Sequence, residues 1–173
     1  MSVVGFDKGC AHAQVDGEHT LAARQSGWAM VLAAALLTAC ASAPKPTEIT
    51  GTAQAAANVN PSVSKRPSPV LLRIYELKTA TAFNSADFIS LYQRDQAELG
   101  AEMVGRQEIV LDPGASKPLG KMTSPDTRFI GVLAAYRDLD RAQWRSVVAI
   151  QPGQKQRVTI SAGELSFSAS VSK

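Results

Sequence analysis

The sequence predicts an all-β sandwich of two sheets with one short helical insertion. Three observations predict this fold class: several short apolar or alternating segments, turn signals at roughly ten-residue intervals, and a single stretch with helical periodicity. The last segment shows the alternation most clearly, because its apolar residues are each followed by a serine. These residues are Leu165, Phe167, Ala169 and Val171. Such alternation is typical of a strand with one face on a core and the other in water.

The first two strands are expected on either side of a proline-rich loop. The alanine-rich stretch 52–59 is only weakly predicted to be the first strand, because its periodicity alone does not distinguish a strand from a helix. The stretch 70–77 is a clear strand whose two faces are both apolar: Val70, Leu72 and Ile74 on one, and Leu71, Tyr75 and Leu77 on the other. Arg73 interrupts the second face, and we interpret it as a solvated or edge residue.

The one helix is expected to begin at Asn84. Asp87 follows three residues later, as in a capping box, and Leu99-Gly100 provides a stop. The apolar residues between these signals recur at helical spacing: Phe88, Leu91 and Tyr92. We expect this stripe to pack on a sheet.

The remaining strands are expected between turns of recognisable chemistry. These strands are 107–111, 117–122 (a weak one), 128–136, 143–150, 157–161 and 164–171. The stretch 128–136 is apolar on both faces, which predicts a central strand that is covered on both sides. Gly131 within it is a candidate for close packing of a neighbouring element. Asp138 and Asp140 form a carboxylate pair, but flanking arginines and an exposed turn favour a hydrated turn over acid–base chemistry.

The amino-terminal stretch 1–39 has the layout of a bacterial secretory signal. Arg24 precedes the apolar run 28–37, and small residues lead to Cys40. Acidic residues are unusual in such a segment, so we expect the translation start downstream of Met1; they are Asp7, Asp16 and Glu18. The alternative is an uncleaved membrane anchor, although the largely apolar stretch 27–43 is at the low edge of the length that crosses a bilayer core.

Leu37-Thr38-Ala39-Cys40 resembles the lipobox of bacterial lipoproteins. The resemblance implies a thioether between diacylglycerol and the Cys40 thiol, cleavage before Cys40 and an N-acyl chain on the new amino terminus. The residue after Cys40 is not aspartate, which by the lipoprotein sorting pattern implies passage to the outer membrane. Residues 40–51, with two prolines, are then a flexible tether, and residues 52–173 are the β-sandwich domain.

Removal of residues 1–39 leaves 134 of the 173 residues, enough for one domain, with 16 basic and 12 acidic side chains. The charges are interspersed, so a nucleic-acid partner is not supported. Cys10, His12 and His19 all lie in the removed segment. The mature domain therefore lacks the residues for Ser-His-Asp or Cys-His sites, for zinc sites with nitrogen or sulfur ligands and for disulfides. We expect no metal and no cofactor other than the acyl chains on Cys40.

The stretch 58–69 is expected to be a loop, because its three prolines prevent a regular element from running through it. Two interpretations remain open from the residues alone. It is either an irregular connection or a semi-rigid binding loop with a basic tip at Lys65 and Arg66.

An ordered set of segments across the mature domain resembles the type VI secretion lipoprotein family that includes TssJ, VasD and SciN. Besides the lipobox, these segments are Asn58-Val59-Asn60-Pro61, Arg66-Pro67-Ser68-Pro69-Val70, Arg73-Ile74-Tyr75-Glu76-Leu77-Lys78, Ala86-Asp87-Phe88, Leu99-Gly100, Leu111-Asp112-Pro113-Gly114, 130–138 and Gln143-Trp144-Arg145. No single segment is specific to this family, but the set of segments in this order is.

The resemblance implies a transthyretin-like sandwich without catalytic activity. A lipid anchors it to the outer membrane, and it faces the periplasm. It also implies binding to the periplasmic C-terminal domain of the inner-membrane protein TssM, within a membrane complex that contains TssL. The contact loop of the family joins the first two strands. It maps onto Asn60, Pro61, Ser62, Val63, Ser64, Lys65, Arg66 and Pro67.

A second class of function is a lipoprotein that binds a glycan or a small ligand, or that inhibits a periplasmic enzyme. An exposed apolar cleft carrying Trp144 or Tyr136 would favour this class, whereas a filled core with only the proline-rich loop projecting would favour a scaffold. An enzyme is the least supported class, because the sequence shows no clustered set of Asp, Glu, Lys, Tyr or Ser.

Overall fold

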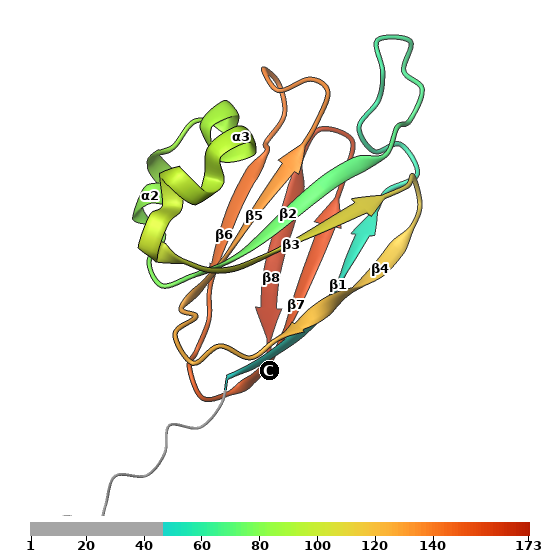
Figure 1. Ribbon diagram of the computed structural model, residues 1–173. Coiled ribbons are helices and arrows are strands. Elements are labelled where there is room, and N and C mark those ends of the chain that lie inside the picture. Colours follow the sequence, from blue (N-terminus) through green and yellow to red (C-terminus); the bar gives the residue numbers. More distant parts are fainter. Residues whose placement is uncertain (1–46) are drawn as a thin grey trace, which may run out of the picture. The chain divides into compact units, whose positions relative to one another are not determined.

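The computed structural model describes residues 47–173, which form two facing four-stranded sheets with helices on one outer face (Figure 1). The predicted signal (1–39), Cys40 and tether residues 41–46 lie outside the described residues. The two-sheet sandwich with a short helical insertion is therefore confirmed.

The first sheet has the strand order β4-β1-β7-β8 and the second has the order β3-β2-β5-β6. The first sheet contains β1 (Glu48–Ala55), β4 (Ser116–Met122), β7 (Lys155–Ala162) and β8 (Phe167–Ser172). The second contains β2 (Val70–Leu77), β3 (Met103–Leu111), β5 (Phe129–Ala135) and β6 (Arg145–Ala149). β1 and β7 pair in parallel, and all other neighbours pair antiparallel.

β1 begins earlier than expected. The prediction of a flexible tether through Gly51 is wrong over its last part, because Glu48 already pairs with Lys155 of β7. Ile49 is buried in the core, and a Cβ at Gly51 would lie 1.9 Å from the Val158 carbonyl oxygen. β1 is thus a central strand packed closely between two neighbours, and it ends at Ala55 rather than at residue 59.

β2 separates two apolar cores, as its two-faced pattern predicted. Leu72 and Ile74 belong to the core between the sheets, and Tyr75 and Leu77 belong to the core under the helices. Each buried aliphatic or aromatic side chain contributes about 1.5–3 kcal/mol to stability. β5 is likewise covered on both sides, as expected.

The helical insertion contains α2 (Thr81–Ser85), α3 (Phe88–Leu99) and the 3₁₀ turn η1 (Gly100–Glu102). The expected helix start at Asn84 is wrong, since Asn84 lies within α2 and Asp87 caps α3 by accepting a 2.9 Å hydrogen bond from Ser90 N. The predicted stop at Gly100 is confirmed, with a φ of 46°. At Gly131, a Cβ would lie 3.0 Å from Leu77 Cδ1 and 3.1 Å from the Phe83 ring. The expected close packing is therefore present.

The loop between β1 and β2 lies at the opposite end of the sandwich from Glu48 (Figure 1). β1 runs directly from one end to the other, and its eight residues rise about 3.3 Å each, so the two ends are about 23 Å apart. The point where the described chain enters the fold is thus separated from the predicted contact loop by the length of the sheet.

Candidate functional site

The β1–β2 loop, residues 56–69, projects beyond the ends of the strands (Figure 1). The eight residues assigned to partner contact divide by exposure along this loop. Asn60 is buried, Pro61 and Ser62 are half-buried, and Val63, Ser64, Lys65, Arg66 and Pro67 are exposed. Only part of the assigned segment is therefore accessible to a partner.

The tip of the loop is a closed turn built around Ser62. Ser62 N donates to the Arg66 carbonyl oxygen and Lys65 N donates to the Ser62 carbonyl oxygen, both at 2.8 Å. The Ser62 hydroxyl accepts a further hydrogen bond from Arg66 N at 3.2 Å. Lys65 takes the left-handed conformation with a φ of 59°, and Val63 is fully exposed. The turn thus presents one apolar and two cationic side chains to solvent.

Asn60 fixes the base of the loop to two other loops. Its backbone N donates to the Glu164 carbonyl oxygen at 3.0 Å, and its side-chain oxygen accepts from Arg137 N at 2.7 Å. Its side-chain Nδ2 donates to the Pro69 carbonyl oxygen at 2.6 Å. Asn60 has a φ of 50°, a conformation that asparagine adopts more readily than most residues. Because the residue is only 3% exposed, Asn60 positions the loop and is not available for direct contact.

A groove of about 790 Å³ lies between the loop tip and the two loops that Asn60 holds. One side is formed by Pro61, Ser62, Val63 and Lys65, and the other by residues 137–141, Glu164 and Leu165. The sequence did not indicate this groove, because its sides come from loops that are far apart along the chain. In the sequence, Asn60 beside Pro61 was the one residue that could have indicated that these loops meet. An isolated asparagine is usually a turn residue, so it did not predict the groove.

Asp138, at the edge of this groove, does not have the properties of a general acid. Its Oδ2 accepts a 2.6 Å hydrogen bond from Arg141 Nε, and this bond and the guanidinium charge hold the pKa of Asp138 below its ordinary value. The interpretation of Asp138 and Asp140 as turn residues fits this geometry.

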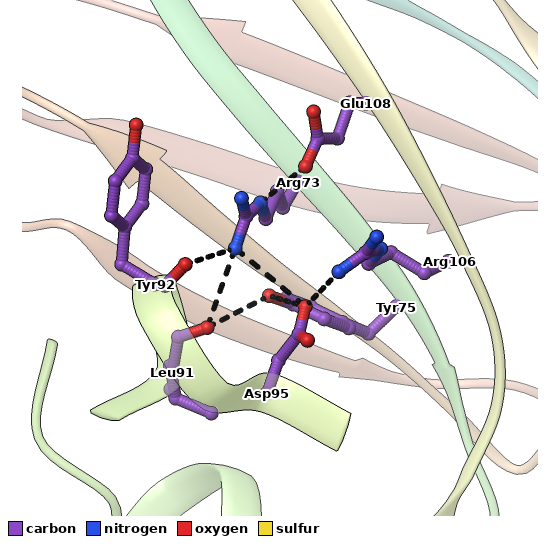
Figure 2. A network of polar contacts seen from close by, with 7 residues as sticks. All are labelled: Arg73, Tyr75, Leu91, Tyr92, Asp95, Arg106 and Glu108. Atoms are coloured by element: carbon purple, nitrogen blue, oxygen red, sulfur yellow. Dashed lines mark hydrogen bonds and ion pairs between the residues drawn. The ribbon is translucent and has the colours of Figure 1, made fainter. Parts of the chain in front are cut away.

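A second cluster of titratable groups joins α3 to the second sheet and was not evident from the sequence (Figure 2). Asp95 of α3 lies 2.5 Å from Arg106 Nη1 and accepts a 3.1 Å hydrogen bond from the Tyr75 hydroxyl. Arg73 donates to Glu108 and to the Tyr92 carbonyl oxygen, both at 2.5 Å, and its side chain is only 13% exposed. The interpretation of Arg73 as a solvated residue is therefore wrong. Sequence spacing did not reveal that α3 covers this face of β2.

The protonation states in this cluster favour a structural role over catalysis. Burial raises the pKa of Tyr75 to about 12. Burial alone would also raise the pKa of Asp95, but the hydrogen bond and charge of Arg106 outweigh it and hold that pKa below its ordinary value. Asp95 is thus ionised and Tyr75 neutral at pH 7, and neither group is poised to exchange a proton near that pH.

The cluster predicts a stability change that depends on pH. A carboxyl whose pKa is lower in the folded state stabilises the fold above the unfolded pKa of about 3.9, and this contribution is lost as the pH falls through the folded pKa. We expect Asp95→Asn to lower the unfolding free energy at pH 7 by about 2 kcal/mol, as for other hydrogen bonds to charged groups. In urea titrations, the difference from wild type should shrink between pH 5 and pH 2. Asp140→Asn, at an exposed position, is the control and should change stability little; a pH-independent effect of Asp95→Asn would contradict the assignment.

The two aromatic residues that would favour a ligand cleft are packed into the fold. Tyr136 is 3% exposed and its hydroxyl donates to the Ser166 carbonyl oxygen at 2.9 Å. Trp144 is half-buried, with its ring edge-on to Phe88 at 5.4 Å and under the Arg145 guanidinium at 4.7 Å. Neither ring lines the groove beside the loop.

Within residues 47–173, no group of three or more His, Cys, Asp or Glu residues is arranged to hold a metal ion. Among the helices of this same part, none has both the length and the apolar character needed to span a membrane.

Residues 47–165 match the family model described as "Type VI secretion lipoprotein, VasD, EvfM, TssJ". No curated protein sequence gives a significant match.

Among solved structures, the T6SS lipoprotein TssJ1 from Pseudomonas aeruginosa is 36% identical, with a TM-score of 0.70 over 74% of this chain and 98% of that chain. Serratia marcescens Lip, a membrane-bound component of the type VI secretion system, is 25% identical, with a TM-score of 0.65 over 71% and 96%. A chain in a structure of the T6SS TssM C-terminal domain from EAEC is 26% identical, with a TM-score of 0.60 over 70% and 99%.

The family match spans residues 47–165, and the similarity to TssJ1 covers 98% of that chain, which confirms the transthyretin-like fold. The matched family is one of membrane lipoproteins, in agreement with the lipobox at Leu37–Cys40. The chain therefore belongs to the type VI secretion lipoprotein family of TssJ and VasD.

Proposed function

We propose that this chain is a non-enzymatic outer-membrane lipoprotein that anchors the type VI secretion membrane complex by binding the periplasmic C-terminal domain of TssM. TssL is a further component of the proposed complex. Family membership supports this function, as does the similarity to chains in structures of a type VI membrane complex and of a TssM C-terminal domain.

The observation that carries the proposal is the projecting, internally bonded β1–β2 loop (Figure 1). Its tip turn exposes Val63, Lys65 and Arg66, while Asn60 holds its base. A loop that is already ordered loses less conformational entropy on binding than a flexible one, so more of its contact energy appears as affinity. We assign partner contact to Ser62–Arg66 and positioning to Asn60.

At the other attachment point we propose that Cys40, outside the described residues, carries diacylglycerol and an N-acyl chain. Each buried CH₂ of an acyl chain contributes about 0.8 kcal/mol, and stable anchoring needs more than one chain. The protein would then link two membranes mechanically, with its lipid in the outer membrane and its loop on a partner from the inner membrane.

The direct test is a titration of the detergent-solubilised, lipidated protein with the TssM periplasmic C-terminal domain. We expect a one-site complex whose affinity weakens from 0.1 M to 1 M salt, because the Debye length falls from about 10 Å to about 3 Å and screens Lys65 and Arg66. Absence of binding at both salt concentrations would contradict the proposed function.

The alternative of a glycan-binding, ligand-binding or inhibitory lipoprotein gains no specific support from the aromatic residues. Tyr136 is buried and Trp144 is packed against α3, so neither offers the open stacking surface that this class needs.

A further inference from the structure

The end of the sandwich at which β1 begins carries a cluster of lysines around one glutamate. Glu48 lies 3.3 Å from Lys121 Nζ and 3.6 Å from Lys155 Nζ. The lysine side chains are 58% and 85% exposed, whereas that of Glu48 is 29% exposed. The cluster therefore has an excess positive charge, and its cations are more accessible than its anion.

The same end is rich in other cations. Lys78 follows β2, Arg128 precedes β5, and Lys173 follows β8; all three are exposed. Arg157 is exposed and pairs with Ser172 at the end of the β7–β8 ladder. The acidic groups at this end are Glu48, Glu76, Glu102 and Asp126; Glu76 accepts a 2.9 Å hydrogen bond from the Thr127 hydroxyl, and Asp126 is paired with Lys78 at 3.6 Å. Basic groups thus outnumber acidic ones where the described chain begins.

The short stretch of chain between Cys40 and β1 limits how far the Glu48 end of the sandwich can lie from a membrane that holds the Cys40 lipid. Residues 40–46 number seven, so they extend by at most about 25 Å. They include Lys45 and no acidic residue. If the lipid is on Cys40, the Glu48 end of the sandwich stays within this reach of the membrane surface.

We propose that this end, with Lys121 and Lys155 nearest the surface, docks on anionic phospholipid headgroups of the membrane that holds the Cys40 lipid. The inference rests on the proposed lipidation and adds an orientation to it. A basic patch and an acyl anchor act together at membranes, and each lysine or arginine near an anionic surface shifts the equilibrium by roughly fivefold. Glu48 holds the two lysines side by side where the chain enters the fold.

Docking in this way points the β1–β2 loop away from the membrane. The loop lies about 23 Å further along β1, so the sandwich acts as a rigid spacer that holds the loop clear of the headgroups (Figure 1). A freely rotating domain would instead present the loop to the membrane for part of the time.

The test uses the lipidated mature chain, which begins at Cys40, in vesicles, with one introduced cysteine at a time. The lipid occupies the thiol of Cys40, so a fluorophore on Gln154→Cys reports the Glu48 end and one on Ser64→Cys reports the loop tip. The probe is a phospholipid with a spin-labelled headgroup, which quenches nearby fluorophores. In vesicles that contain phosphatidylglycerol, we expect at least threefold stronger quenching at position 154 than at position 64. The difference should decrease in pure phosphatidylcholine or in 1 M salt.

Lys121→Gln with Lys155→Gln should remove most of this difference, while the matched pair Lys65→Gln with Arg66→Gln should leave it unchanged. Equal quenching at both positions in protein that floats with the vesicles would overturn the docking proposal alone. Failure of the wild-type chain to float would overturn both the lipid anchor and this proposal.

Discussion

Replacement of Ser62–Arg66 by two glycines should weaken binding to the TssM periplasmic domain at least a hundredfold. The replacement removes the exposed Val63, Lys65 and Arg66. Residues at the centre of an interface commonly contribute about 2 kcal/mol or more each, and a loss of about 1.4 kcal/mol weakens affinity tenfold. Two glycines can bridge the gap because Ser62 N is hydrogen-bonded to the Arg66 carbonyl oxygen, so the ends of the turn are adjacent. Titration calorimetry measures the change.

The fold should survive this replacement, since the Asn60 bonds to Pro69 and Arg137 lie outside the excised turn. An unchanged thermal midpoint would confirm that the sandwich is intact. Lys155→Gln with Arg157→Gln removes two exposed cations at the opposite end and should change the TssM affinity less than threefold. Wild-type affinity in the glycine variant would exclude the loop as the contact site.

Cys40→Ser should move the protein from the membrane fraction to the soluble periplasmic fraction. Without the thiol, no thioether to diacylglycerol can form, and the acyl chains that we propose as the membrane anchor are lost. Fractionation measures the location of the protein, and mass spectrometry of the mature chain measures the mass of the attached lipid.

Cys10→Ser is the matched control, because Cys10 lies in the segment expected to be removed. Its fractionation and mature mass should equal those of the wild type. Retention of Cys40→Ser in the outer membrane would contradict the lipid anchor, and the mature mass would show whether an uncleaved amino-terminal segment holds the protein instead.

These two variants separate the two proposed attachment points. The loop variant should stay in the membrane and fail to bind TssM, whereas Cys40→Ser should bind TssM and leave the membrane. A mechanical link needs both ends, so each variant alone should prevent assembly of the complex at the outer membrane.

The sequence determined the features that depend on local pattern. The two-faced β2, the alternating β8 and the central β5 were predicted because a strand repeats every two residues and its apolar pattern shows which faces are covered. The helix start was misplaced, since both Asn84 and Asp87 are good capping residues and only the geometry selects Asp87. The early start of β1 was missed because threonine, glycine and alanine give little apolar signal, although their small size lets neighbouring strands approach closely.

The tertiary structure alone decided which polar residues are buried and what they hold. Arg73, interpreted from the sequence as solvated, is enclosed by α3 and paired with Glu108 (Figure 2). Asn60, assigned to partner contact by resemblance, is buried where three loops meet. Both outcomes depend on residues distant in the chain, whose proximity no local periodicity encodes. The sequence thus determined the fold class and the position of the loop, while long-range packing decided which loop residues are exposed and which end of the sandwich carries the exposed lysines.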